Sequence, residues 1–193
     1  MFQCRHQPFA LAPELVARLA TSYADARRAY HTAAHIAEVL GWFDVVADEV
    51  AWTDPSTVYA AIVFHDAIYV PGAKDNEARS AAWCLAEGFS RRSAHLIELT
   101  ARHGGFVPGD VDDEAALFLD CDMAILAASP DAFAEYDRQI EFEYQHVPPE
   151  AYRAGRRAFL AGVLAKPRIF LSDYFHAKLD ANARANLAAA ISL

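Results

Sequence analysis

The chain has 193 residues and a net charge of -9, from 17 basic and 26 acidic side chains. Its length and ordinary apolar content suit one domain with a sizeable buried core. The acidic balance disfavours binding to a nucleic acid polymer, because such binding depends on clustered lysine and arginine side chains that release counterions. A small phosphorylated metabolite stays open as a partner, since a metal ion or a few local cations can offset the surrounding charge.

The first residues, 1–6, lack the basic start and long apolar core of a signal peptide, and no run in the chain approaches about 20 apolar residues. We therefore expect a cytoplasmic protein with no membrane partner. The three cysteines, Cys4, Cys84 and Cys121, are far apart and show no CxxC spacing, so neither a zinc knuckle nor a disulfide framework is indicated.

Apolar residues recur at three- and four-residue steps much more often than at every second residue, which predicts an all-α helical bundle. Asp54 and Ser129 each precede a proline, the pattern of a capping side chain before the first helical position. In chain order, the expected helices are Pro13–Arg28, Thr32–Asp48, Pro55–Phe64, Asn76–Gly88, Ser93–Arg102, Asp112–Ala127, Pro130–Tyr144, Pro149–Leu164 and Ala177–Ile191. Glycine and proline predict the two strongest loops, at 71–75 and 104–110, which either connect helices or line a pocket.

Three groups of polar side chains interrupt this helical pattern. His31 and His35 are four residues apart, a spacing that places side chains on one face of a helix. His65-Asp66 lies within an otherwise apolar run, where a divalent metal ion would give both side chains a reason to face inward; a buried hydrogen-bonded pair is the alternative. Asp120-Cys121-Asp122 places two carboxylates in another apolar stretch.

This order of His, His-Asp and Asp resembles the HD superfamily of metal-dependent phosphohydrolases. The resemblance implies four metal ligands, His35, His65, Asp66 and Asp122. Residues two apart on a helix point to different faces, so Asp120 and Asp122 cannot both easily reach one ion, and Asp122 matches the family better. Segments similar to a small bacterial branch of predicted HD phosphohydrolases are 64–69, 75–77, 80–81, 120–126, 143–147 and 155–156.

Two imidazoles and two carboxylates suit one divalent ion, which could be Mn, Fe, Co, Ni, Zn or Mg. With four protein ligands, an octahedral ion keeps positions open for water and for a phosphate oxygen, a combination suited to hydrolysis. The resemblance therefore implies a single HD-type domain over 1–193, with the metal site built from about 31–122.

Further catalytic roles follow from the same resemblance. The segment 30–35 resembles the first helix of cyclic-nucleotide phosphodiesterases, which makes His31 the proton donor to the leaving oxygen; a histidine bonded to local carbonyls or solvent is the alternative. Asp66 is catalytic as a metal ligand. Glu77 either orients the attacking water or supports a ligand histidine, or it is a first-turn glutamate favoured by the helix dipole.

Phosphate oxygens are negatively charged and are bound by cationic side chains. Arginine binds these oxygens through paired N–H donors. Arg156 is the preferred substrate-binding residue, followed by Arg79, for which a surface ion pair is an equal alternative. His103 would contact substrate or a second metal ion, whereas His95 is expected to have a core or surface role.

The leading function is a phosphomonoesterase or phosphodiesterase acting on a small phosphorylated metabolite, for example a nucleotide. One alternative is a regulatory protein that binds metal and nucleotide without turnover. Another is a di-iron oxygenase of the HD type, which would need His95 or His103 as an extra ligand. A homodimer is open, because four aromatic residues suit either a core or a dimer face: Trp42, Phe43, Trp52 and Trp83.

Overall fold

The structure, a computed structural model, describes residues 2–192. All regular secondary structure within these residues is helical, which confirms the predicted all-α class. The chain divides into two compact units, Met1–Arg102 and His103–Leu193. The HD-type arrangement and the single domain over 1–193 stay predictions.

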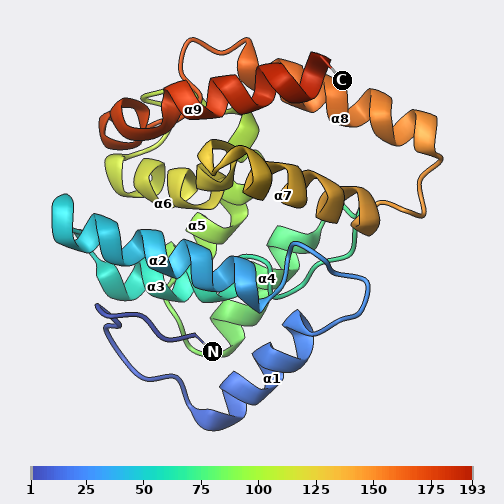
Figure 1. Ribbon diagram of the computed structural model, residues 1–193. Helices are drawn as coiled ribbons and strands as arrows, with labels where there is room; N and C mark the ends of the chain where they lie inside the picture. The colour runs from blue at the N-terminus through green and yellow to red at the C-terminus, as the bar shows by residue number, and fades with distance from the viewer. Residues whose placement is uncertain (1, 193) are drawn as a thin grey trace. The chain divides into compact units, whose positions relative to one another are not determined.

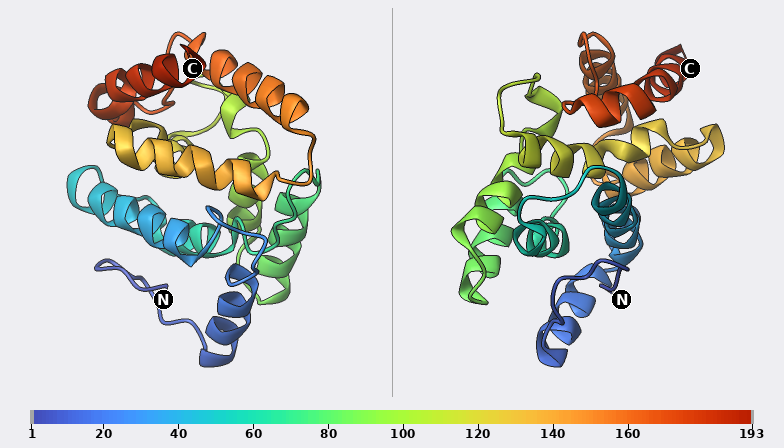
Figure 2. Two further views of the ribbon diagram at one scale, coloured as in Figure 1. Left: turned by 45° about the vertical axis from the view of Figure 1, so that its right-hand side comes forward. Right: turned by 90° about the vertical axis from the view of Figure 1, so that its left-hand side faces the viewer.

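The first unit holds five α-helices. They are α1 (Pro13–Tyr23), α2 (Ala33–Glu49), α3 (Pro55–Phe64), α4 (Asn76–Ala86) and α5 (Arg91–Thr100). Helix α3 packs against α2, α4 and α5, and α4 packs along α5. Figure 1 and Figure 2 show α2 and α3 side by side. Helix α3 is therefore the centre of this unit.

Every residue of α3 from Thr57 to Phe64 is buried. A helix that is apolar on all sides is typical of a core position. At its end, the Phe64 ring lies edge-on to Trp83, with 5.8 Å between ring centroids, and 5.3 Å from the ring of Phe89. Packing on several sides thus fixes the direction in which the chain leaves α3, at His65.

The aromatic residues considered for a dimer face differ in burial. Phe43 is buried and stacks on Trp52 with ring centroids 5.4 Å apart, and the Trp52 indole N–H donates to the Phe43 carbonyl. Trp42 and Trp83 are partly exposed. The homodimer stays a prediction.

Asp54 caps α3, as its place before Pro55 predicts. Its carboxylate accepts hydrogen bonds from the Thr57 backbone N–H at 3.1 Å and from the Thr57 hydroxyl at 2.6 Å. These two bonds lower the pKa of Asp54 below its ordinary value of 3.8, and the bond from the Thr57 hydroxyl has the larger effect. The cap therefore stabilises the folded state most when the carboxylate is ionised.

Replacing Asp54 by alanine should lower the free energy of unfolding by about 1 kcal/mol at neutral pH, because the Thr57 N–H loses its acceptor. A depressed folded-state pKa means that the contribution is present above the unfolded-state pKa and is lost as the pH falls through the folded-state value. Urea unfolding should therefore show the two proteins converging below about pH 4. Asp54→Asn is the control, since asparagine keeps a cap acceptor; an equally large loss in both variants would contradict the capping role.

Helix α1 ends earlier than the sequence predicts, at Tyr23 and not at Arg28. The Asp25 carboxylate accepts from the Arg27 backbone N–H at 2.9 Å, a local turn that competes with the helix. The predicted end was therefore wrong by five residues.

The second unit holds the remaining helices. They are η1 (His103–Gly105), α6 (Asp113–Met123), η2 (Ala124–Ala127), α7 (Pro130–Glu143), α8 (Pro149–Leu164) and α9 (Asp173–Ser192), where η marks a 3-10 turn. Helix α9 packs against η2 and α8, and α8 and α9 lie side by side in Figure 1 and Figure 2. Bounds of α8 match the prediction at both ends.

Two predicted bounds in this unit were wrong. The helix expected over 112–127 is α-helical only to Met123 and then tightens into η2. Helix α9 begins at Asp173 and not at Ala177, because the Ser172 hydroxyl accepts from the Phe175 backbone N–H at 3.2 Å, as a residue capping a helix does.

Both predicted loops contain a glycine in the left-handed region, Gly72 with φ +82° and Gly109 with φ +92°, as tight turns require. The η1 turn occupies the start of the second loop. Among the described helices, none combines the length and the apolar character needed to cross a lipid bilayer.

Candidate metal centre and its surroundings

Three of the four predicted metal ligands come together in the first unit. His35 lies in the first turn of α2, His65 caps the C-terminus of α3, and Asp66 follows directly. The Nε2 atoms of the two histidines are 3.1 Å apart, and Asp66 Oδ2 lies 3.1 Å from His65 Nε2 and 3.6 Å from His35 Nε2. These three side chains could hold a metal ion.

The orientation of His65 is set by the helix that carries it. Its Nδ1 is 2.8 Å from the Ile62 carbonyl, an acceptor only, so Nδ1 carries the proton and Nε2 presents a lone pair. A backbone carbonyl bonded to the second ring nitrogen is the usual support for a histidine that binds metal. His65 is thus held in the tautomer that a metal ion needs.

The separations of the donor atoms fit a metal ion. Two ligands about 2.1 Å from one ion and at right angles to each other are about 3.0 Å apart. The contacts of His65 Nε2 with His35 and with Asp66, both 3.1 Å, have this spacing. Two nitrogens and one oxygen suit a divalent transition metal better than calcium. A hydrogen bond between the two imidazoles is the alternative that needs no ion.

Asp66 is well shielded from solvent, with 14% of its side chain exposed. Burial by itself would raise the pKa of this carboxyl, but the combined electrostatic effect of the nearby His65, His31 and His35 imidazoles outweighs burial and holds the pKa below its ordinary value. Asp66 is therefore an ionised carboxylate beside two imidazoles, which is the state that binds a cation.

His31 lies beside this group, as its predicted role requires. It immediately precedes Thr32, which caps α2. Its ring stacks on Tyr69, with centroids 4.1 Å apart and planes 26° apart, and lies 6.0 Å from the His35 ring. The stack holds the imidazole near the donors while leaving it partly exposed. No signal in the sequence pointed to Tyr69 beyond its place in the segment 64–69.

Asp120 has a structural role in the second unit. Its carboxylate accepts from the backbone N–H groups of Leu171 and Ser172, each at 2.8 Å, and from the Ser172 hydroxyl at 2.6 Å. Burial raises the pKa of Asp120 to about 6, against the opposing effect of these hydrogen bonds. Both of its oxygens are therefore committed to holding the chain ahead of α9.

Asp122, the fourth predicted ligand, contacts a histidine of its own unit. It lies on α6, and its Oδ2 is 2.7 Å from Nδ1 of His103 in η1. His103 therefore contacts a predicted metal ligand, and this contact is of the kind that orients a ligand carboxylate. Asp122 belongs to the second unit, and its role as a ligand stays a prediction.

Three other candidates belong to the first unit and are partly or fully exposed. Glu77 is in the first turn of α4, and no hydrogen bond or ion pair of its carboxylate is found within residues 2–192. Arg79 is exposed, with Nη1 4.0 Å from Asp75, the surface ion pair considered as its alternative. His95 is exposed on α5. Catalytic Glu77 and substrate-binding Arg79 stay predictions.

Arg156, on α8, is largely buried. Its Nε donates to Asp137 at 2.8 Å and its Nη1 donates to the Tyr136 hydroxyl at 3.3 Å. The guanidinium also lies over the Tyr136 ring, 4.9 Å from its centroid. Its Nη2 is buried with no hydrogen-bond partner within residues 2–192. This N–H group therefore lacks an acceptor among the described residues, and substrate binding by Arg156 stays a prediction.

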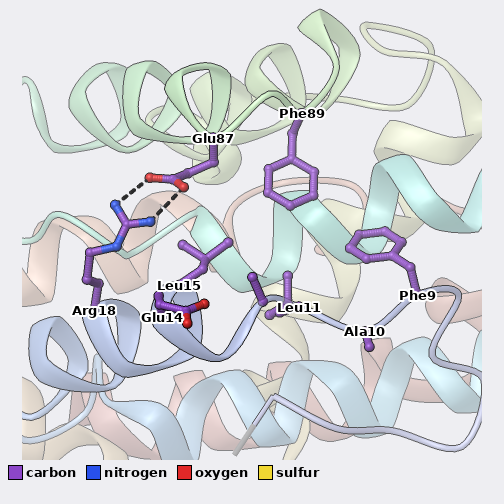
Figure 3. A pocket seen from close by; sticks show the side chains of 9 residues that line it. Phe9, Ala10, Leu11, Glu14, Leu15, Arg18, Glu87 and Phe89 are labelled. Atoms are coloured by element: carbon purple, nitrogen blue, oxygen red, sulfur yellow. Dashed lines mark hydrogen bonds and ion pairs between the residues drawn. The ribbon is translucent and has the colours of Figure 1, made fainter.

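A separate hollow of about 310 Å³ lies elsewhere in the first unit. It is lined mainly by apolar side chains, and at one side Arg18 donates twice to Glu87 (Figure 3). None of the predicted site residues lines it. Its lining residues are Phe9, Ala10, Leu11, Ala12, Glu14, Leu15, Arg18, Glu87 and Phe89.

The fold and the donor group together define an all-α protein with a candidate centre for a metal ion. Comparison with known proteins identifies no matching family, no similar curated protein and no similar solved structure.

Proposed function

We propose that this protein is a metal-dependent phosphohydrolase of the HD type that acts on a small phosphorylated metabolite, such as a nucleotide. The observation that carries the proposal is the convergence of His35, His65 and Asp66, whose donor atoms lie 3.1 to 3.6 Å apart. The order of these residues in the chain is that of the HD superfamily, and Asp122 is the fourth ligand that the same resemblance implies.

A bound divalent ion would polarise the phosphorus centre and lower the pKa of an attacking water. The protein's own side chains supply the rest. His31 donates a proton to the leaving oxygen, from a position beside the ligand histidine His35. Arg156 is the predicted phosphate-binding residue, and Glu77 is the residue predicted to orient the attacking water.

The alternatives receive less support. A di-iron oxygenase needs His95 or His103 among the metal ligands, and the donor group found within residues 2–192 contains neither. A regulatory protein that binds a nucleotide without hydrolysing it would have the same metal centre, so an activity assay is needed to distinguish it from an enzyme. The first experiment measures release of inorganic phosphate from nucleoside monophosphates, and release of the alcohol and monoester products from phosphodiesters, with each of Mn, Fe, Co, Ni, Zn and Mg. Metal-dependent release supports the proposal, whereas tight nucleotide binding without product supports the alternative.

Replacing His31 by asparagine should separate proton donation from metal binding. We expect kcat for an alkyl phosphate to fall by about 10²- to 10⁴-fold, because its leaving oxygen needs a proton. The kcat for a p-nitrophenyl phosphate ester should fall much less, because its leaving group departs as a stable anion and needs no proton. Metal content should equal that of the wild type. An equal loss with both substrates would show that His31 is not the general acid.

A further inference from the structure

Arg28, predicted from the sequence as the last residue of a helix, is buried. Only 8% of this residue is exposed to solvent, whereas its neighbour Arg27 is exposed and pairs with Asp25. Burying a cation is costly unless donors on the side chain are satisfied. The direction in which Arg28 points therefore calls for an explanation.

The guanidinium of Arg28 joins the two chain segments that carry the metal-binding histidines. Its Nη1 donates to the His31 carbonyl at 3.0 Å and to the Asp66 carbonyl at 2.7 Å. Its Nη2 donates to the Ala67 carbonyl at 3.1 Å. One side chain thus bonds the main chain just before α2, the helix that carries His35. The same side chain bonds the main chain at Asp66 and Ala67.

Neighbouring residues brace the same connection. The Ser22 hydroxyl donates to the Ala67 carbonyl, and the Tyr23 hydroxyl donates to the Val63 carbonyl at 2.9 Å. The Arg28 Cζ lies 5.2 Å from the Tyr23 ring centroid and 5.6 Å from that of Tyr69, the ring on which His31 stacks. These contacts hold the charged group between aromatic rings and carbonyl dipoles, which offsets part of the cost of its burial, although Nε is buried without a hydrogen-bond partner among the described residues.

The geometry points to Arg28 as a positioning residue of the metal centre, which sets the separation between the segment of His31 and His35 and the segment of His65 and Asp66. The inference rests on the proposed metal-dependent function. Arg28 touches main-chain carbonyls and not the donor atoms, so it acts through the ligands and does not bind the ion.

Arginine suits this task because its planar guanidinium presents five donors in a fixed fork. Lysine would keep the charge and much of the aliphatic stem, but its donors start from one atom and cannot span three carbonyls in the same geometry. Methionine would keep the stem and remove every donor. The pair Arg28→Lys and Arg28→Met therefore separates charge from bridging geometry.

The test is Co2+ binding by the full chain, measured by competition with a chelator, together with the visible absorption of the Co2+-loaded protein. Arg27→Met is the matched control, since Arg27 is an adjacent arginine whose side chain is 66% exposed. Circular dichroism and thermal unfolding of each variant report the folded fraction. We expect Arg28→Met to weaken Co2+ affinity about 10- to 100-fold and to change the absorption spectrum. Arg28→Lys should show the same changes to a smaller degree, and Arg27→Met should match the wild type.

A folded Arg28→Met protein with wild-type affinity and spectrum would overturn the inference. If that variant does not fold, Arg28→Lys decides in the same way. A loss of thermal stability with an unchanged Co2+ spectrum in the folded protein would show a structural role only, and would also overturn it.

The proposed function can be wrong while the role of Arg28 in the metal centre is right. If the wild type binds Co2+, the Arg28 variants weaken binding, and no phosphorylated substrate is hydrolysed, then Arg28 positions a metal centre that has another use. If the wild type binds no Co2+, both the metal centre and the role of Arg28 are wrong.

Discussion

Replacing Asp66 by alanine is expected to abolish metal binding and phosphate release together while leaving the protein folded. The carboxylate supplies one of three converging donors, and its contacts are with the two histidines. Metal affinity should therefore fall by more than the about 10- to 100-fold typical of losing a group that only supports a ligand. Without the ion, hydrolysis should fall to the background rate, because neither the phosphorus centre nor the attacking water is activated.

The measurement is elemental analysis of the wild type and the variant, purified without chelator, followed by phosphate release with added metal. Asp75→Ala is the matched control, since Asp75 is a carboxylate of the same unit with 65% of its side chain exposed. It should keep the metal and the activity. Circular dichroism confirms the helical fold of all three proteins. Phosphate release that persists in Asp66→Ala would exclude the proposed centre as the active site.

The second large effect concerns stability, and it separates Asp120 from Asp122. Asp120→Ala leaves the backbone N–H groups of Leu171 and Ser172 without their acceptor. Unsatisfied buried donors cost about 1–3 kcal/mol each, so we expect a loss of about 3 kcal/mol and a melting temperature lower by roughly 5–10 °C. Asp122→Ala should change stability less and metal affinity more, because it removes the predicted fourth ligand.

The pH dependence gives an independent check of Asp120. Its pKa is raised to about 6 in the folded protein, from an ordinary value of 3.8. A carboxyl with a raised pKa binds its proton more tightly in the folded state, so it adds stability as the pH falls from about 7 towards 4. The difference in unfolding free energy between wild type and Asp120→Ala should therefore widen over this range.

Metal binding to the two aspartate variants is compared at low temperature, where Asp120→Ala remains folded. Wild-type metal content in Asp120→Ala and a loss in Asp122→Ala would support Asp122 as the fourth ligand. The reverse result, with the metal lost from folded Asp120→Ala and kept in Asp122→Ala, would contradict both the assignment of the ligand and the structural role of Asp120.

Local signals were sufficient for several elements. The bounds of α3 and α8 follow the sequence prediction at both ends, because each begins with a proline that is compatible only with the first helical turn. The spacing of apolar residues was sufficient for the all-α class. The resemblance to the HD superfamily, carried by the order of His35, His65 and Asp66, predicted that these side chains come together, and the structure brings them together.

Contacts between distant segments decided the rest. The turn at Asp25 is a local reason for the early end of helix α1, but nothing near Arg28 in the sequence indicates that its side chain turns inward to the carbonyls of Asp66 and Ala67. Asp120 and Asp122 are equivalent by local pattern, and only the placement of Leu171 and Ser172, about 50 positions along the chain, gives Asp120 its structural role.

The sequence by itself thus determined the helical class, the best-marked helix ends and the residue types at the candidate metal centre, because propensity, capping and apolar spacing act within a few residues. The tertiary structure decided which nitrogen of His65 faces the candidate centre, which aspartate is bonded to the backbone and which arginine is buried against the carbonyls of Asp66 and Ala67. Those outcomes depend on hydrogen bonds whose partners are brought together only when the helices pack, and burial makes each missing partner costly.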